Sequence, residues 1–219
     1  MTATGKLVLI AGATSASGRA VAAALLDAGA RVVSVGSDAG RLADVSSALP
    51  GLVTELCDLT EEESVAALAE RVHAQLGPID GLVHLVGGWR GGGGLAGQTD
   101  ADYRVLERSL TALRHVTRAF NDDLLASPAG RLAIVSATAV ERPTPGNANY
   151  VAVKSAAEAW TRAVGHGFAS RQADAPTRSA AVVYRVKALA GLEDQLAASV
   201  VGLWDADASA LNGSVIPLS

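Results

Sequence analysis

Short apolar runs rich in valine, leucine and isoleucine alternate along the chain with longer alanine-rich segments whose apolar residues recur at helical spacing. The runs have the length of buried strands, and the segments have the length of helices. The pattern predicts strands at Leu7–Ala11, Arg31–Val35, Leu52–Leu56, Gly81–Val86, Arg131–Val135, Ala180–Leu189 and Ser214–Leu218. It predicts helices at Gly18–Ala28, Asp38–Leu49, Tyr103–Ser127, Asn149–Ser170 and Glu193–Trp204, and another that is capped by Thr60 and ends at Gly77.

Regular alternation of strands and helices predicts the fold class. Parallel strands need crossover connections, which helices of this length supply while covering both faces of the sheet. We therefore expect an α/β fold with a doubly wound, mostly parallel sheet. No linker and no internal repeat interrupts the pattern, so residues 1–219 are expected to form a single domain, with Ser214–Leu218 as an edge strand.

The composition limits the class of protein and the compartment that we expect. Apolar residues make up 49% of the chain and charged residues 18%, which excludes an intrinsically disordered protein. The longest apolar runs, Leu7–Ala11 and Ala20–Leu26, fall short of the roughly 20 residues that a membrane helix needs. Residues 1–6 lead directly into a strand, so no signal peptide is expected. The single cysteine, Cys57, favours a reducing, cytoplasmic setting.

Charge and motif content exclude several classes of function. The net charge is −4 and the basic residues are dispersed, so nucleic acid is not an expected partner. The four histidines stand far apart without a carboxylate or cysteine at ligand spacing, and no metal site is expected. The chain contains neither the G-x-S-x-G motif of many hydrolases nor a complete P-loop.

A glycine turn after the first predicted strand leads into a helix. In such a turn, backbone N–H groups meet a pyrophosphate at the positive end of the helix. A plain glycine-rich connection is the alternative interpretation. The residues predicted to hold a dinucleotide phosphate here are Gly12, Thr14, Ser15, Ala16, Ser17 and Gly18.

A tyrosine and a lysine stand four residues apart at the start of the helix after the fifth predicted strand. This spacing places Tyr150 and Lys154 on one helix face. A phenol with a pKa of about 10 needs a nearby cation to serve as an acid–base group near neutral pH. An ordinary surface pair is the alternative, but the position downstream of the glycine turn favours a catalytic pair.

Together these features resemble the short-chain dehydrogenase/reductase family over nearly the whole chain. The resemblance implies an NAD(P)H-dependent oxidoreductase with strand order 3-2-1-4-5-6-7. It makes Tyr150 the proton donor and acceptor. It gives Lys154 two roles, to hold the nicotinamide ribose hydroxyls and to lower the pKa of Tyr150. It places Asp58 against the adenine amine, although Asp58 is also open to interpretation as a helix cap. The remaining cofactor-binding residues implied are Leu59, Val86 and Gly87.

The chain also departs from the family pattern at its catalytic positions. Ala137 replaces the usual serine and Ser109 replaces the usual asparagine of the long helix. Ser136 is the candidate catalytic hydroxyl, but neighbouring strand residues face opposite sides, so its use requires a local bend. The segment after Leu189, which usually closes over the substrate, is short.

One branch of the family, the dihydropteridine reductases, shows a similar set of departures. These enzymes carry a glycine-rich run like Gly87–Gly92 and a T-P-G sequence like Thr144–Gly146. The likeness implies a planar pterin or quinonoid acceptor, with Trp89 as a flat wall for its ring. Packing of Trp89 on the sheet edge, and plain flexibility of the glycine run, are the alternatives.

The end of the second strand indicates which dinucleotide is preferred. NAD enzymes usually place an acidic residue there, but this chain has Val35. Ser37 is a candidate hydrogen-bond donor to a 2′-phosphate, with Arg19 or Arg41 to neutralise it. The pattern favours NADP over NAD, although Asp38 offers an alternative contact for the 2′-hydroxyl of NAD.

Three functions follow as hypotheses. The first is an NAD(P)H-dependent reductase of a small, pterin-like, quinonoid or carbonyl substrate. The second is a catalytically silent NAD(P)-binding sensor or scaffold, suggested by Ala137, Ser109 and the short lid. The third is a cofactor-independent cyclase or epimerase. The family resemblance further implies a homodimer or homotetramer that pairs its two long helices.

Overall fold

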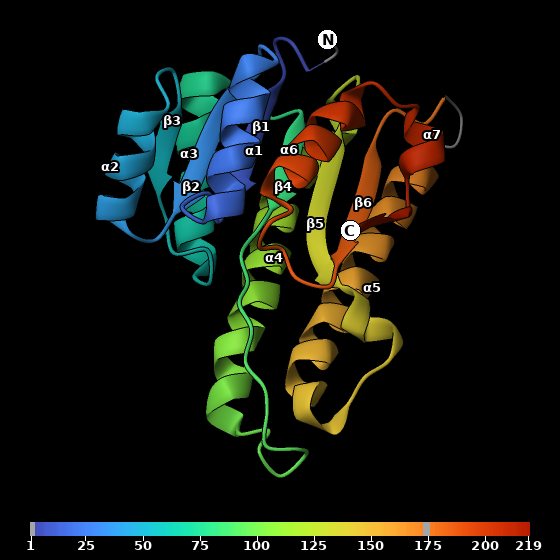
Figure 1. Cartoon of the computed structure of the whole chain (residues 1–219). Helices are drawn as coiled ribbons and strands as arrows, with labels where there is room; N and C mark the ends of the chain where they lie inside the picture. Colours follow the sequence, from blue (N-terminus) through green and yellow to red (C-terminus); the bar gives the residue numbers. More distant parts are fainter. Residues whose placement is uncertain (1–2, 173–175) are drawn as a thin grey trace.

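A central sheet of seven parallel strands organises this computed structural model, which describes residues 3–172 and 176–219 (Figure 1). The strand order is β3-β2-β1-β4-β5-β6-β7, which confirms the predicted topology. Every neighbouring pair in the sheet is parallel. The strands are β1 Leu7–Ala11, β2 Arg31–Gly36, β3 Val53–Leu56, β4 Gly81–His84, β5 Arg131–Ala137, β6 Ala180–Val186 and β7 Val215–Leu218.

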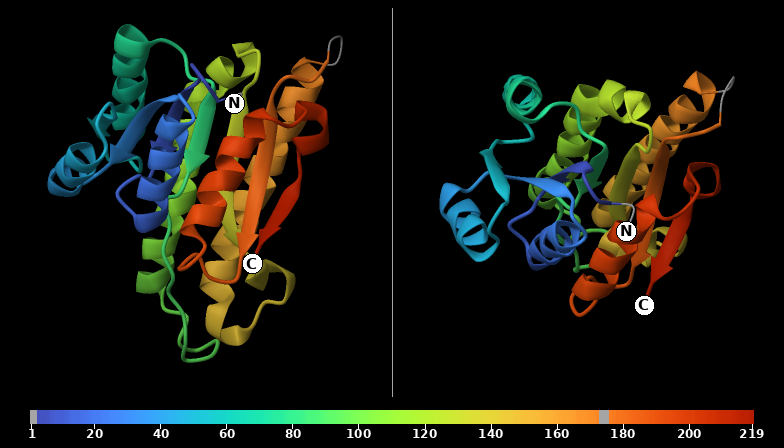
Figure 2. Two further views of the ribbon diagram at one scale, coloured as in Figure 1. Left: turned by 45° about the horizontal axis from the view of Figure 1, so that its top comes forward. Right: turned by 90° about the horizontal axis from the view of Figure 1, so that it is seen from above.

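Helices cover both faces of this sheet, as the two views of Figure 2 show. One apolar core lies between the sheet and α1, α2 and α6, and the other lies between the sheet and α3, α4 and α5. This arrangement confirms the predicted doubly wound fold. The helices are α1 Ala16–Asp27, α2 Ala39–Ala48, α3 Glu62–Leu76, α4 Asp100–Ala126, α5 Ala148–Arg171, α6 Glu193–Val201 and α7 Ala208–Leu211.

Local sequence accounts for where these helices begin and end. Ser15 caps α1 by accepting a hydrogen bond from Gly18 N, and Asp38 caps α2 by accepting one from Arg41 N. Thr99 caps α4, whose first turn carries the acidic residues that the helix dipole favours. Gly77 ends α3 with φ +92°, a conformation that costs glycine little.

Several predicted boundaries were wrong. Thr60 does not cap α3: its amide and hydroxyl both donate to Asp58, and the helix begins after Glu61. The sixth strand ends at Val186, because the chain turns away from the sheet edge before Leu189. The fourth ends at His84, and residues 202–204 continue α6 as a 3₁₀ turn. The short helix α7 and the 3₁₀ turns Thr138–Glu141 and Pro145–Asn147 were not predicted.

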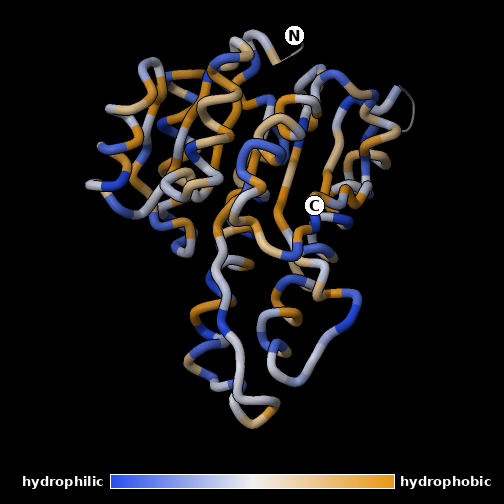
Figure 3. Tube along the Cα trace, viewed as in Figure 1, coloured by the Kyte–Doolittle hydropathy of each residue, from blue (hydrophilic) through white to orange (hydrophobic). Residues whose placement is uncertain are grey.

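The long helices α4 and α5 extend beyond the carboxyl ends of the strands, together with the loop between β4 and α4 (Figure 1). Hydrophobic residues concentrate in the sheet and its two flanking layers, whereas this extension is largely polar along its chain trace (Figure 3). Within the described residues, no helix has the length and apolar character needed to cross a membrane.

Candidate active site

Two neighbouring cavities open at the carboxyl ends of the strands, where the connections from β1 and β4 diverge to opposite faces of the sheet. Such a switch point is where doubly wound sheets bind ligands. The main cavity has a volume of about 470 Å³ and the second cavity about 170 Å³. Val86 lines both, so the two cavities adjoin at the end of β4.

The turn between β1 and α1 forms the boundary of both cavities. Gly12 has φ +85°, and a Cβ at this position would lie 2.8 Å from Val86 N. A Cβ on Gly18 would lie 2.6 Å from Ala13 Cα, so both glycines permit close backbone packing. Ala16 is an exposed first residue of α1, and its methyl group fits a regular helical turn. The first-turn amides of α1 have no intrahelical acceptor, which suits an anion such as a pyrophosphate.

The hydroxyls of this turn have different partners. Ser15 Oγ donates to Gly12 O and accepts from Gly18 N, so this side chain already serves as the helix cap. Ser17 is buried and lines the main cavity, whereas Thr14 lines the second cavity. Hydroxyls of the turn therefore line both cavities.

The second cavity has the features of an adenosine site. Ser37, Asp58 and Leu59 line it. Asp58 accepts hydrogen bonds from Thr60 and pairs with Arg108, at 3.3 Å between Nη2 and Oδ2. The bonds from Thr60 contribute most to holding the pKa of Asp58 below its usual range. Asp58 is thus ionised and held in place by its turn, which suits a carboxylate that accepts from a nucleobase amine.

Tyr150 and Lys154 lie one helical turn apart on α5, and both line the main cavity. Lys154 Nζ donates to Val135 O at 2.8 Å and lies 5.9 Å from the centroid of the Tyr150 ring. Burial lowers the pKa of Lys154 to about 8, while the Glu158 carboxylate opposes that shift. Burial also raises the pKa of Tyr150, so this phenol is protonated at neutral pH. The expected lowering of the Tyr150 pKa by Lys154 is not seen in the chain by itself.

Ser136 lies on the face of β5 that packs against α5. Its buried hydroxyl lines the main cavity and lies next to the Glu158 carboxylate, outside regular hydrogen-bond geometry. Glu158 accepts two hydrogen bonds from Arg185, at 2.9 and 2.7 Å, and Arg185 also pairs with Glu141. This network joins β6, α5 and the turn after β5. The local bend that the sequence interpretation required is absent, since β5 continues unbroken through Ala137, and Ser136 lines the same cavity as Tyr150 without it.

His84 ends β4 at the floor of the main cavity and is buried. Its Nε2 lies 3.1 Å from the carbonyl oxygen of Ser109 on α4, and its Nδ1 has no hydrogen-bond partner in the described part of the chain. Burial, followed by the nearby Lys154 ammonium, lowers the pKa of His84 to about 3. The imidazole is therefore neutral at physiological pH.

The glycine-rich loop after β4 is held in place by Gln98. The Gln98 amide nitrogen lies 3.0–3.3 Å from the carbonyl oxygens of Gly92, Gly94 and Gly146, and its amide oxygen accepts from Asn149 N. Gly91 packs so closely that an added Cβ would lie 2.6 Å from Gly146 O. The loop is thus bonded to the turn that precedes Tyr150, rather than being a free flap.

Trp89 and the connection between β6 and α6 form the outer wall of the main cavity. Trp89 lines the cavity and keeps 60% of its surface exposed, so it is not packed on the sheet edge. Residues 187–190 line the opposite side, and α6 begins at Glu193, which confirms the short lid. Lys187 is exposed in this connection and is a cation at the cavity mouth that the sequence interpretation did not identify.

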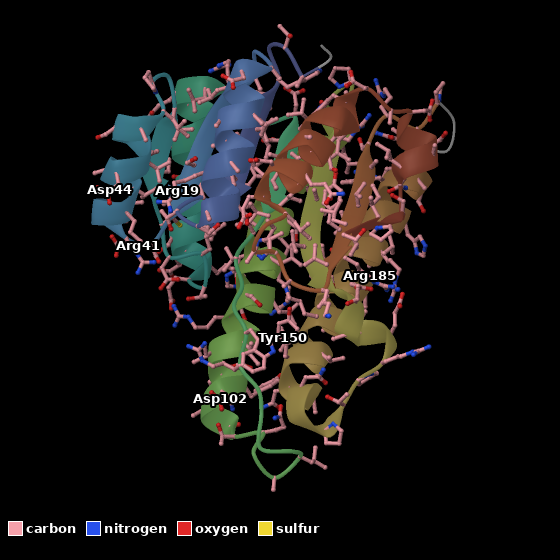
Figure 4. All side chains as sticks on the ribbon, viewed as in Figure 1. Arg19, Arg41, Asp44, Asp102, Tyr150 and Arg185 are labelled. Carbon is pink, nitrogen blue, oxygen red and sulfur yellow. The ribbon has the colours of Figure 1, made fainter. Side chains whose placement is uncertain are left out.

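The structure brings nearly all of the predicted site residues to the two cavities. The exceptions are Ala16 and Gly18, which support the turn from behind. Arg19 of α1 and Arg41 of α2 project on the same side of the molecule (Figure 4), and Arg41 lies 3.7 Å from the Asp38 carboxylate. Figure 4 also shows Tyr150 on the extension formed by α4 and α5. Sequence interpretation did not place His84 in the same cavity as Lys154, because a single histidine on a strand carries no spacing signal.

The two cavities fit a nicotinamide dinucleotide. A glycine cradle that any Cβ would fill stands at the phosphate position, a fixed carboxylate lies in the adenosine-sized cavity, and a tyrosine–lysine pair lies in the larger one. Among the described residues, no cluster of histidine, cysteine and carboxylate side chains is suited to hold a metal ion.

Comparison with known proteins agrees with a dinucleotide-binding site. The model of the family "short chain dehydrogenase" matches residues 6–175. The 3-oxoacyl-(acyl-carrier-protein) reductase FabG of Haemophilus influenzae is 26% identical over 171 residues, covering 76% of this chain and 69% of that protein. Nodulation protein G of Rhizobium meliloti is 31% identical over 170 residues, covering 77% of this chain and 69% of that protein.

Solved structures show the same fold. An NADPH-bound short chain oxidoreductase of Pseudomonas aeruginosa, described as containing an atypical catalytic center, has a TM-score of 0.83 at 20% identity, covering 98% of this chain and 95% of that one. A short chain dehydrogenase of Bacillus anthracis has a TM-score of 0.84 at 17% identity, with the same coverage. The family match over residues 6–175, the fold and the paired cavities agree. This chain therefore belongs to the short-chain dehydrogenase family and is an NAD(P)-dependent oxidoreductase.

Proposed function

We propose that this protein is a reductase in which Tyr150 protonates a small carbonyl or planar quinonoid substrate in the main cavity while Lys154 orients the nicotinamide ribose. A bound nicotinamide supplies the hydride. The observation that carries the proposal is the placement of Tyr150 and Lys154 on one face of α5, in the larger of two adjoining cavities at the switch point. Their separation suits one group for the substrate and one for the dinucleotide.

The protonation state of Tyr150 supports reduction. Because burial raises the pKa of Tyr150, its hydroxyl carries a proton at neutral pH and is ready to give it to a substrate oxygen or nitrogen. The Lys154 ammonium lies over the Tyr150 ring, 5.9 Å from its centroid, and is the nearby cation available to the phenolate left behind. Ser136 stays our candidate for an additional hydrogen bond to the substrate, since its hydroxyl is buried at the cavity wall.

Substitution of the phenol tests this assignment. Tyr150→Phe is expected to lower the rate of hydride transfer by about 10²- to 10⁴-fold, the range typical of a lost general acid. Binding of the reduced dinucleotide, followed by its fluorescence, should be retained. Tyr103→Phe on α4 is the matched control and should keep the wild-type rate. A wild-type rate in the Tyr150→Phe protein would contradict the proposal.

The second candidate function is a nucleotide-binding sensor or scaffold without turnover. Ala137 at the end of β5 supplies no hydroxyl, and Ser109 Oγ is bonded to Leu106 O of its own helix. A wild-type protein that binds dinucleotide but transfers no hydride to a panel of carbonyl and quinonoid acceptors would favour this function.

We also propose a preference for NADP. Val35 is buried and apolar, and the carboxylate of Asp38 already caps α2 and pairs with Arg41. Ser37 lines the second cavity and is our candidate to bind a 2′-phosphate, with the guanidinium of Arg41 or Arg19 to neutralise its charge.

Side-by-side titration with NADPH and NADH tests this preference. NADPH should bind more tightly, and Arg41→Ala should weaken NADPH binding several-fold while leaving NADH binding unchanged. Arg118→Ala on α4 is the control, because Arg118 pairs with Glu62 away from both cavities. Equal affinities for the two dinucleotides in the wild-type protein would contradict the preference.

Trp89 supports a planar acceptor, such as a pterin-like ring, because its exposed indole forms a flat wall of the main cavity.

A homodimer or homotetramer built on α4 and α5 is a further part of the proposal. Light scattering after size-exclusion chromatography tests this oligomeric state. Cys57 is a free, buried thiol, and a reducing cytoplasmic compartment stays a prediction.

A further inference from the structure

The imidazole of His84 combines deep burial with one unpartnered nitrogen, at the floor of the main cavity. Only 5% of the residue is exposed, and Nδ1 has no hydrogen-bond partner among the described residues. A buried polar atom without a partner is costly, so such an atom in a cavity indicates that a ligand, a water or a rearranged side chain completes it.

The contact on the other nitrogen fixes the tautomer. Nε2 faces the carbonyl oxygen of Ser109 at 3.1 Å, and a carbonyl oxygen only accepts hydrogen bonds. Nε2 therefore carries the hydrogen. In a neutral imidazole this leaves a bare lone pair on Nδ1, so the open position of His84 is an acceptor that calls for a donor.

Lys154 is the donor that the surroundings supply. An ammonium has three N–H groups, and in this structure one of them is bonded to Val135 O. Lys154 lines the same cavity as His84 and is the charged group that acts on the imidazole. From α4, His84 meets the uncharged Ser109 carbonyl, and Glu158 is occupied by Arg185.

We propose that His84 is a positioning residue whose Nδ1 accepts a hydrogen bond from one water that is in turn bonded to the Lys154 ammonium. Val135 O and this water then hold two of the three N–H groups, and the third is aimed at the cofactor ribose. This inference rests on the proposed function of Lys154. His84 transfers no proton itself, because an imidazole with a pKa of about 3 is an acceptor at neutral pH.

Loss of this acceptor has a definite consequence for Lys154. Burial lowers the pKa of Lys154 to about 8, and a hydrogen bond accepted from the ammonium opposes this shift because it favours the charged form. Removal of that bond therefore lowers the pKa of Lys154 relative to the protein in which the bond is made. The charged fraction that can bind the ribose then falls at lower pH. The effect acts on dinucleotide affinity and on its pH dependence, independently of turnover.

Titration of the reduced dinucleotide between pH 6 and 9 tests the proposal with two variants. His84→Leu removes the acceptor and is expected to weaken binding at pH 8 about tenfold, the size of one hydrogen bond to a charged group. The pH at which half of the affinity is lost should also move downward. His84→Asn keeps an acceptor near the position of Nδ1 and should bind within about threefold of the wild type.

Ser34→Ala is the matched control, since Ser34 is also buried with an unpartnered hydroxyl but lies on β2 away from Lys154. Its affinity and pH dependence should be those of the wild type. Circular dichroism shows whether each variant is folded. Wild-type affinity and pH dependence in His84→Leu, or equal losses in His84→Leu and His84→Asn, would overturn the role of His84. A wild-type protein that binds no dinucleotide would instead overturn the proposed function.

Discussion

Buried and partly buried polar side chains gather around the carboxyl ends of β4, β5 and β6. Lys154 and His84 lie together at the floor of the main cavity, and burial shifts the pKa of each downward. Burial opposes ionisation of Glu158, but its carboxylate stays charged because Arg185 donates a hydrogen bond to each of its oxygens. Burial of a polar group costs free energy, and this cost is limited here because each group has a partner or faces the cavity.

The low pKa of His84 makes a prediction about acid stability. The unfolded chain binds a proton at a pKa near 6.5, and the native chain binds it at about 3, so the native state takes up fewer protons between these values. Stability contributed by His84 is therefore complete above pH 6.5 and falls with decreasing pH, by at most about 1.4 kcal/mol per pH unit. His84→Leu should remove this part of the slope.

Urea unfolding of the dinucleotide-free protein at pH 7, 6 and 5 measures this slope, with the fluorescence of buried Trp204 as a probe. Ser34→Ala removes a buried group that does not titrate and should leave the slope as in the wild type. A His84→Leu protein with the wild-type slope would show that His84 titrates normally in the folded state.

Elements beyond the sheet form the substrate side of the site. The loop between β4 and α4, the turn before α5 and the connection from β6 to α6 meet around the main cavity, and Gln98 bonds the first two together. The first of these carries Trp89, and the second leads into Tyr150. The position of the cavity wall thus depends on a few backbone contacts rather than on a packed core.

Removal of the Gln98 side chain should loosen this wall. Gln98→Ala is expected to increase hydrogen exchange in residues 88–97 by about tenfold or more, because up to four hydrogen bonds are lost at once. The midpoint of global unfolding should change little. Gln75→Ala, an exposed position on α3, is the control. Unchanged exchange in the loop would mean that backbone contacts alone hold it.

At the scale of the whole molecule, the ligand site joins the two halves of the sheet. The second cavity is lined mainly by residues at or just after the ends of β1, β2 and β3, together with Arg108 and Ala112 of α4. The main cavity is lined by residues at or after the ends of β1, β4, β5 and β6, and by Tyr150 and Lys154 of α5. A dinucleotide that spans both cavities contacts nearly every strand end, and its binding free energy adds directly to the stability of the fold.

Thermal unfolding tests this coupling. At a dinucleotide concentration 100 times its Kd, stability should rise by about 2.7 kcal/mol, which corresponds to a Tm increase of about 5–10 °C for a chain of this size. The measurement is a thermal scan with and without NADPH, with adenosine at the same concentration as the control. An unchanged Tm at saturating NADPH would contradict a site that spans both halves of the sheet.

The sequence by itself determined which segments form the strands and helices, because hydrophobic periodicity is a local property of the chain. The strand order, and the place of Tyr150, Lys154 and Asp58 at the two cavities, were predicted from the resemblance to the family rather than from periodicity. The predicted boundaries of elements were less accurate where local signals compete. Thr60 bonds to Asp58 instead of capping α3, and β6 ends before Leu189.

Only the tertiary structure decided what lies beside these residues. It buried His84 in the cavity that Lys154 also lines, set Ser136 against Glu158, and brought Gln98 to the turn before Tyr150. Each of these contacts joins segments far apart in the chain, and their burial sets the pKa values on which the chemistry depends. Periodicity specifies which face of an element is apolar, but the polar groups that meet across that face are fixed only when the helices pack on the sheet.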